Sequence, residues 1–243
     1  MLPGERYEYC VSILPPTDSY SRFLTAGISL PAVEDRGKVI LLVDNTLASS
    51  FTTELSQLKE DLVGDGWRVI RYDVARHDDT TWANNPANIA SIHQLIASAY
   101  DASAKAIYII GHVAIPMSGY DGPDSHGERV MPADAYYGDV DGIWSDAVNF
   151  GSTGTVEFTN STAYGNIPGD GKFDPNYLPS AAELGVGRVD FARMPAFANP
   201  PPGGTARSEV ELLRQYLNKA HAHKLTGWVG RESGVVGAYA NEY

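Results

Sequence analysis

Three things are scarce in this sequence: cysteine, basic residues and long apolar runs. Cysteine occurs once, at Cys10, which excludes an intramolecular disulfide framework and a cysteine-based zinc site. A lone thiol on a terminal strand is more typical of a packing residue than of a nucleophile. Lysine and arginine together number 18 against 30 aspartates and glutamates, and the net charge of -12 argues against nucleic acid or an anionic membrane as partner. No apolar run approaches the roughly 20 residues that a membrane-spanning helix needs.

The chain has 243 residues, which suits one large α/β domain or one domain plus an appendage. Its N-terminal residues contain no apolar segment of a secretion signal, so we expect any such signal to have been removed or to lie upstream. Few lysines and many Asp, Asn, Thr, Tyr and Gly residues favour a secreted or extracellular location.

Apolar strands alternate with helices from residue 38 onwards. Residues 39–43, 67–73 and 106–110 are predicted strands, and between them lie two predicted helices with apolar residues at helical spacing. Because such an alternation requires right-handed crossovers, it predicts a parallel sheet, which residues 183–190 rejoin. Ser208 and Glu211 form a capping-box pattern ahead of a last helix that runs to about His221. The predicted fold class is α/β, a three-layer sandwich around a mostly parallel sheet.

The first 36 residues have a different pattern. Residues 7–13 alternate in the period-two manner of a half-buried strand, and residues 23–30 form a second extended stretch. Two strands alone are marginally stable, so we expect this segment to pack on the main domain or to be the tail of an upstream β-domain. The predicted organisation is an N-terminal β segment (1–36), an α/β domain (37–225) and the start of a following unit (226–243).

The predicted strand at 106–110 leads into a loop that is dense in carboxylates. After Gly111 and His112, residues 113–146 contain seven acidic residues and one arginine, Arg129. Like charges at this density repel one another unless they are solvated or share a metal ion. Because parallel sheets carry their sites at the carboxyl ends of the strands, we expect the functional site at this edge.

Two acidic stretches suit calcium, a cation that takes six to eight oxygen ligands. Asp139 and Asp141 set two carboxylates two positions apart, and the stretch from Asp170 to Asp174 partly matches an EF-hand loop. The match is incomplete, which excludes a full EF-hand. We predict an irregular calcium site with Asp139, Asp141, Asp170 and Asp174 as ligands; an ordinary solvated turn is the alternative.

Arg188 lies within an apolar predicted strand. A buried guanidinium requires a carboxylate partner, and we predict a structural ion pair with Asp190 or with an acid of the loop 147–180. Substrate binding by Arg188 is the alternative.

Aromatic residues gather in the acidic loop. Together with Asp134, the residues Tyr136, Tyr137 and Trp144 are candidates for a loop contact surface, since aromatic rings stack on sugars. Packing within the loop is the other interpretation.

The order of motifs along the chain resembles that of one peptidase family. An apolar strand is followed by GHVAIP, PADAYYGDVDGIWSD, ELGVGRVDFARMPAF and a helix ending LNKAHAHK. Over residues 38–223 this order is similar to the first half of the gingipain-type cysteine peptidases and their uncharacterised secreted bacterial relatives. The resemblance implies two caspase-like α/β halves. The His–Cys dyad then belongs to the second half, and the first is a supporting lobe that often holds calcium.

Two features depart from the family pattern. His112 stands where the pattern has aspartate, and no cysteine follows Cys10. The sequence therefore lacks the thiolate that such chemistry requires. The resemblance implies a supporting, non-catalytic half that is inactive alone, with its catalytic partner in a downstream half beyond Tyr243.

Two other functions stay open. A histidine at the carboxyl end of a buried strand could be a catalytic imidazole oriented by an aspartate, which would make the chain a self-sufficient hydrolase using His112. No Gly-x-Ser-x-Gly motif supplies a nucleophile, and a buried, hydrogen-bonded imidazole is the structural interpretation of His112. The remaining alternative is a calcium-stabilised extracellular binding or structural module that contacts a glycan or a protein partner.

Overall fold

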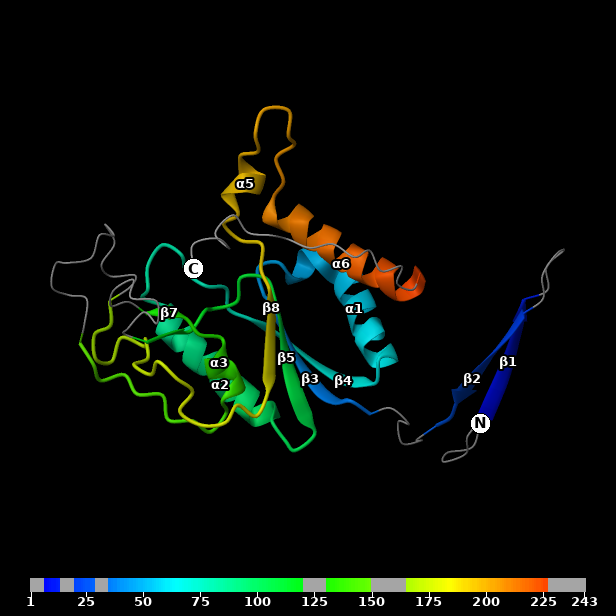
Figure 1. Cartoon of the computed structure of the whole chain (residues 1–243), viewed down its shortest axis with the longest axis horizontal. Helices are drawn as coiled ribbons and strands as arrows, with labels where there is room; N and C mark the ends of the chain where they lie inside the picture. The colour runs from blue at the N-terminus through cyan, green and yellow to red at the C-terminus, as the bar shows by residue number, and fades with distance from the viewer. Residues whose placement is uncertain (1–6, 14–19, 29–34, 120–129, 150–164, 227–243) are drawn as a thin grey trace, which may run out of the picture.

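The centre of the molecule is a four-stranded parallel sheet. The computed structural model describes residues 7–13, 20–28, 35–119, 130–149 and 165–226. The strand order is β4-β3-β5-β8 (Figure 1), with β3 at Gly37–Asp44, β4 at Trp67–Val74, β5 at Ala104–Ile110 and β8 at Gly185–Val189. All three pairings are parallel. The prediction of a parallel sheet from the strand–helix alternation is confirmed.

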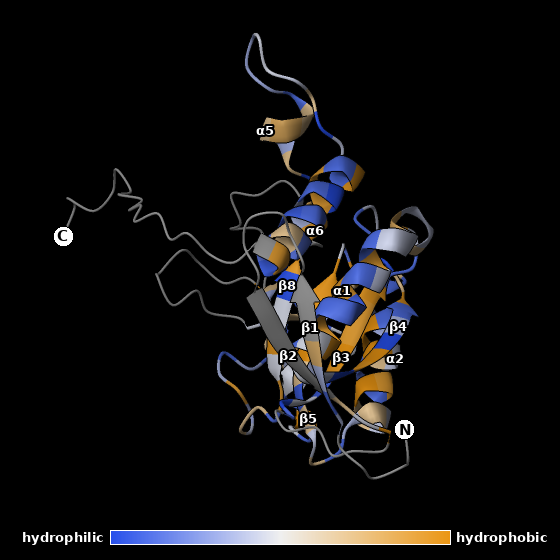
Figure 2. Cartoon of the chain, turned by 90° about the vertical axis from the view of Figure 1, so that its right-hand side faces the viewer, coloured by the Kyte–Doolittle hydropathy of each residue, from blue (hydrophilic) through white to orange (hydrophobic). Residues whose placement is uncertain are grey.

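Helices cover both faces of this sheet. One face carries η1 (Ala48–Phe51), α1 (Thr52–Gly64) and α6 (Glu209–Thr226), and the other carries α2 (Asn85–Ala99) and α3 (Ala135–Gly138). In β3, Leu41 and Val43 pack toward α1 and α6, whereas Ile40 and Leu42 pack toward α2, and all four are fully buried. Figure 2 shows hydrophobic residues along β3 and mostly hydrophilic residues on the visible sides of α1 and α6. The predicted three-layer α/β sandwich is confirmed.

The last helix begins as the capping-box pattern predicts. The Ser208 amide donates to Glu211 Oε2 at 2.7 Å, and the Glu211 amide donates to Ser208 Oγ at 3.2 Å. The helix continues past its predicted end near His221 as far as Thr226. Near that end His221 Nδ1 lies 3.0 Å from Asp61 Oδ2, which holds α6 against α1.

The remaining elements are short. Strands β1 (Tyr7–Ile13) and β2 (Tyr20–Ala26) form an antiparallel hairpin, which in Figure 1 lies outside the layered domain. The second strand was predicted at residues 23–30 and lies at Tyr20–Ala26, where its register pairs Ala26 with Tyr7. Beyond β5 the chain forms β6 (Met117–Ser118) and β7 (Met131–Pro132), and beyond β8 it forms α5 (Pro195–Ala198).

Candidate functional site

His112 lies at the carboxyl edge of the sheet, directly after β5. The preceding Gly111 has a φ of 86°, and a side chain there would overlap Asp44, so this turn requires glycine. The turn places the His112 ring, which is 6% exposed, between two carboxylates. Its Nδ1 lies 2.6 Å from Asp190 Oδ2, and its Nε2 lies 3.1 Å from Asp79 Oδ1. These residues follow β8 and β4, so three strand ends supply the cluster.

The two carboxylates favour the protonated form of His112. Burial by itself would lower the pKa of the imidazole, but the hydrogen bonds and charges of Asp190 and Asp79 outweigh burial and raise this pKa. Burial likewise opposes ionisation of Asp190, yet its contact with His112 lowers the pKa of that carboxyl. A general base must present an unprotonated nitrogen to the nucleophile. In His112 both ring nitrogens face carboxylates, which is the geometry of a structural imidazolium.

A second histidine, His77, packs edge-on against His112 with 5.3 Å between the ring centroids. Its Nδ1 accepts a hydrogen bond of 3.1 Å from the backbone amide of Ile115. Burial, assisted by the positive charge of His112, lowers the pKa of His77 to about 4. The pKa values of the two rings are thus shifted in opposite directions, toward the charged form for His112 and toward the neutral form for His77.

The other charges at this edge are also paired. Arg76 Nη1 donates to Asp44 Oδ2 at 2.6 Å and its Nη2 donates to Glu209 Oε2 at 2.8 Å, which connects β4 to β3 and α6. Arg193 Nη1 lies 3.0 Å from Asp79 Oδ1. The carboxyl edge, where we predicted the site, is thus bound together by ion pairs between strand and helix ends.

The predicted ion pair between Arg188 and Asp190 is wrong. Arg188 pairs with Asp134 instead, through Nε to Oδ2 and Nη2 to Oδ1, each at 2.7 Å, and its Nη1 donates to the Val113 carbonyl at 2.7 Å. Asp190 is engaged by His112, whereas Asp134 presents both oxygens to the guanidinium fork. Asp134 is therefore the ion-pair partner of Arg188.

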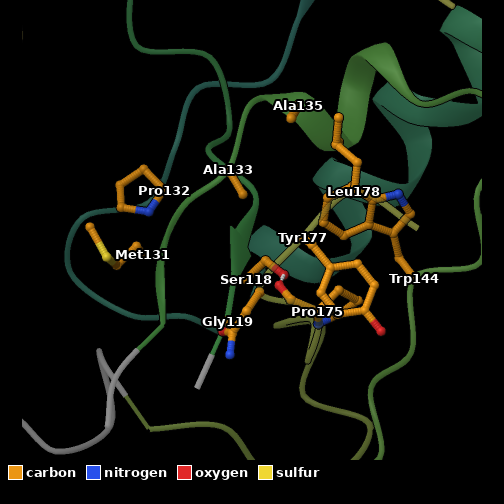
Figure 3. Close-up of a pocket in the computed structure, with 11 residues that line it drawn as sticks. Ser118, Gly119, Met131, Pro132, Ala133, Ala135, Trp144, Pro175, Tyr177 and Leu178 are labelled. Atoms are coloured by element: carbon orange, nitrogen blue, oxygen red, sulfur yellow. Dashed lines mark hydrogen bonds between the residues drawn. The ribbon is translucent and has the colours of Figure 1, made fainter. Parts of the chain in front are cut away.

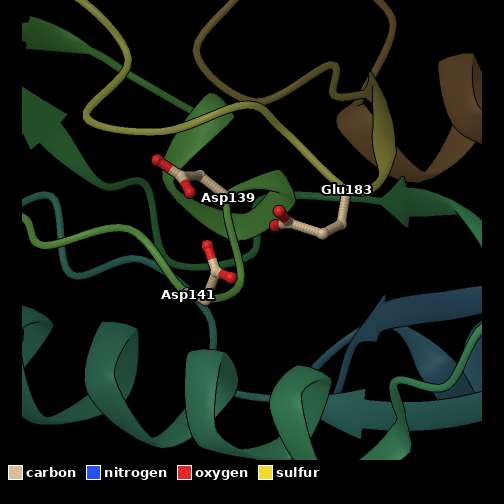
Figure 4. Close-up of side chains that lie close together, drawn as sticks. All are labelled: Asp139, Asp141 and Glu183. Carbon is tan, nitrogen blue, oxygen red and sulfur yellow. The ribbon is translucent and has the colours of Figure 1, made fainter.

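Asp139 and Asp141 lie with Glu183 near the amino end of β8. Figure 4 shows Glu183 reaching toward the turn after α3 that carries the two aspartates. One carboxylate oxygen of each residue lies within 4.8 Å of the others. Asp139 is buried, Glu183 is half-buried and Asp141 is exposed. This group, the carboxylate cluster, could hold a metal ion.

The groups around the carboxylate cluster leave its charge uncompensated. Trp144 Nε1 donates to Asp139 Oδ2 at 3.1 Å, and a backbone amide donates to Glu183 Oε2 at 2.7 Å. The Ser180 hydroxyl contacts both Asp139 and Asp141, although it has a single hydrogen to donate. Within the described ranges, none of these three carboxylates forms an ion pair with Lys, Arg or His. Such a set of carboxylate oxygens is the kind of donor set that hard divalent cations prefer.

Asp170 and Asp174 do not join the group of carboxylates within 4.8 Å of one another, which corrects the four-ligand prediction, although Asp174 lines the same surface hollow as Asp141. Burial opposes ionisation of Asp174, but hydrogen bonds, first among them that of the Ala147 amide at 2.9 Å, lower its pKa. Lys172 is 2% exposed, and its ammonium lies 3.3 Å from Asp170 Oδ2 and donates to the Gly165 carbonyl at 2.7 Å. A lysine therefore supplies the positive charge in the loop where we predicted calcium.

Tyr136 and Tyr137 are core residues, which corrects the predicted contact surface. They are 9% and 0% exposed. The Tyr137 hydroxyl donates to the Ala114 carbonyl at 2.8 Å, and Tyr136 stacks on Phe173 with 4.4 Å between ring centroids. Both rings pack on the α2 side of the sheet, so the packing interpretation applies to them. Trp144 is only partly buried against the same cluster.

The acidic residues of the loop after His112 do not gather at one edge. Three of them lie outside the described residues: Asp121, Asp124 and Glu128. Of the others, Asp134 binds Arg188, and Asp139 and Asp141 lie near the amino end of β8. Asp146 accepts hydrogen bonds of 2.8 and 2.7 Å from the backbone amides of Gly169 and Gly171. The prediction of one anionic field beside His112 is wrong for these residues, because the chain turns back along the sheet after α3.

No helix in the described ranges is long and apolar enough to span a membrane. The chain matches no family model, no curated protein and no solved structure.

Proposed function

We propose that this chain is a supporting, non-catalytic α/β lobe of a secreted gingipain-like cysteine peptidase. The observation that carries the proposal is the environment of His112, whose two ring nitrogens are held by Asp190 and Asp79. A histidine that serves a nucleophile needs one nitrogen free of carboxylates. The single thiol of the sequence, Cys10, belongs to the β1–β2 hairpin, not to the sheet edge that carries His112.

The lobe binds calcium at the carboxylate cluster. Three carboxylates supply hard oxygen ligands, and calcium tolerates the irregular geometry of a turn better than magnesium, which demands a regular octahedron. The backbone at Gly142 lies so close to the Asp139 carboxylate that any side chain there would overlap it. A bound ion would neutralise the cluster and join the segment after α3 to the segment ahead of β8. Its role is structural.

Hydrolysis assays test the first part of the proposal. The full chain is incubated with a mixture of peptide substrates and a thiol reductant, beside its His112→Ala variant. We expect no hydrolysis above the buffer control from either protein. Saturable hydrolysis by the wild type that disappears in His112→Ala would overturn the assignment as a non-catalytic lobe.

Thermal melting tests the calcium site separately. At a calcium concentration of about 100 times Kd, binding adds roughly 2.7 kcal/mol, which corresponds to about 5–10 °C in Tm for a domain of this size. We expect Glu183→Gln to abolish this shift. Glu60→Gln, an exposed substitution on α1, is the matched control and should keep it. Identical melting curves of the wild type in calcium and in chelator would remove calcium from the proposal and leave the hydrolysis result untouched.

A further inference from the structure

Two adjoining hollows open on the surface beside the carboxylate cluster. The first has a volume of about 480 Å³ and is lined mainly by apolar groups, among them Met131, Trp144 and Leu178 (Figure 3). The second has a volume of about 550 Å³ and is lined both by polar groups, among them Asp141, Asp174 and Ser180, and by apolar groups such as Ile143. Neither lining contains a lysine, arginine or histidine.

Tyr177 forms the wall that the two hollows share. Its side chain is 79% exposed, and Leu178 and Met131 in the first hollow are 43% and 45% exposed. Large apolar side chains gathered in this way on a surface mark contact sites more often than chance. Pro175 and Pro179 flank the wall and restrict its backbone, so that holding the ring in place costs little entropy.

The linings differ in the chemistry that they accept. The first hollow offers little for hydroxyl groups to bond and suits a large aliphatic or aromatic side chain. The second offers the exposed carboxylate of Asp141 and one face of a tyrosine ring, a combination that suits a guanidinium or an ammonium. The net charge of -12 adds a long-range attraction for basic partners.

We propose that this face binds an extended peptide segment of a partner protein. A large apolar side chain of the peptide enters the first hollow, and an arginine or lysine close to it in sequence enters the second, beside Asp141 and over Tyr177. Residues i and i+2 of an extended chain point to the same side and lie about 7 Å apart, which suits two hollows with a common wall. The proposal requires neither the calcium site nor the assignment as a peptidase lobe.

Fluorescence polarisation with labelled peptides tests the proposal. The probes are short Gly/Ser peptides that carry one leucine and one arginine, separated by a spacer that varies from none to three serines, and the full chain is titrated in chelator. We expect at least one peptide to bind saturably with a Kd of about 100 μM or lower. Its counterpart with glutamate in place of arginine should bind at least about tenfold more weakly.

Variants locate the binding on this face. Tyr177→Ser should weaken binding about tenfold and Asp141→Asn about fivefold. Val63→Ser, which changes a 54% exposed side chain on α1, is the control and should leave the Kd unchanged. Tyr177 is exposed, so its variant should keep the circular dichroism spectrum of the wild type. A labelled glucose oligosaccharide is titrated in parallel.

Three results would each overturn the proposal. They are the absence of saturable binding by every peptide, equal affinity for the arginine and glutamate peptides, and equal effects of Tyr177→Ser and Val63→Ser. Binding of the oligosaccharide in place of the peptides would also overturn it and would assign the face to glycans.

Discussion

The His112 imidazolium should stabilise the fold strongly, and His112→Ala measures by how much. The substitution leaves Asp190 and Asp79 facing a gap without their cation. Removing one partner of a fully buried ion pair costs about 3–5 kcal/mol, but the side chains of Asp79 and Asp190 are 23% and 16% exposed, so water compensates in part. We therefore expect a loss of about 3 kcal/mol in the free energy of unfolding, equivalent to roughly 6–12 °C in Tm. Urea unfolding followed by circular dichroism at pH 6 provides the measurement.

The pH dependence of this loss identifies its origin. The pKa of His112 is raised in the folded protein, so its stabilisation is complete below the unfolded value of 6.5 and is lost as pH rises through the folded value. The difference between wild type and His112→Ala should therefore shrink from pH 6 to pH 9. His223→Ala, at an exposed site on α6, should change stability by less than about 0.5 kcal/mol at either pH. A loss at His112 that stayed constant with pH, or that matched the His223 control, would refute the imidazolium as a structural cation.

Other substitutions test the remaining charges. Arg188→Met should lower the free energy of unfolding by about 3 kcal/mol in a urea titration, because it leaves the Asp134 carboxylate without its cation. Adding Asp134→Asn to this variant should lower the free energy little further, whereas additive losses would argue against an ion pair between the two residues. Lys172→Met should lower the Tm without changing the calcium-induced shift in Tm, because the ammonium balances Asp170 and not the carboxylate cluster. Loss of the calcium-induced shift in this variant would contradict the assignment of the ion to the carboxylate cluster. His77 has a pKa of about 4 against 6.5 when unfolded, so stability should fall as pH drops through this interval. The full effect at 1.36 kcal/mol per pKa unit is about 3 kcal/mol, and partial exposure reduces it to roughly 2 kcal/mol. His77→Gln should reduce the loss of stability between pH 6.5 and pH 4 in a plot of unfolding free energy against pH. An unchanged loss in this variant would contradict the lowered pKa of His77.

The fold follows from patterns that are local in sequence. The central strands β3 and β5 are short apolar runs, β4 and β8 carry β-branched residues between polar ones or glycines, and each long helix shows its buried side at helical spacing. The strands could therefore be placed to within two residues. Strand–helix alternation then fixes a parallel sheet through the handedness of crossovers. The start of α6 was equally accessible, because the Ser208–Glu211 capping box needs only four consecutive residues.

The site was much harder to predict, because its contacts join residues that are distant in sequence. Asp79 and Glu183 were missed because nothing local distinguishes them from solvated side chains: Asp79 follows another aspartate in a polar stretch, and Glu183 begins the predicted strand at 183–190. Arg188 was correctly expected to need a carboxylate, but its partner depends on how the chain turns at α3, which brings Asp134 to it. Lys172 lies in the loop where we predicted calcium, and its side chain already supplies a positive charge there. A lysine between two aspartates is a local signal that the sequence itself contains.

Asp141 belongs to both proposed binding sites, so the binding of calcium can be tested through its effect on peptide binding, and the reverse. It belongs to the carboxylate cluster and also lines the second hollow, so a calcium ion would neutralise the carboxylate that an arginine needs. The two ligands should therefore oppose each other, and thermodynamic linkage requires the effect to be reciprocal. We expect saturating calcium to weaken peptide binding about fivefold, and saturating peptide to weaken calcium binding by the same factor. Asp141→Asn should abolish this coupling. If calcium raises the Tm while the peptide Kd stays fixed, the carboxylate is not shared, and the basic side chain of the peptide must lie outside the second hollow.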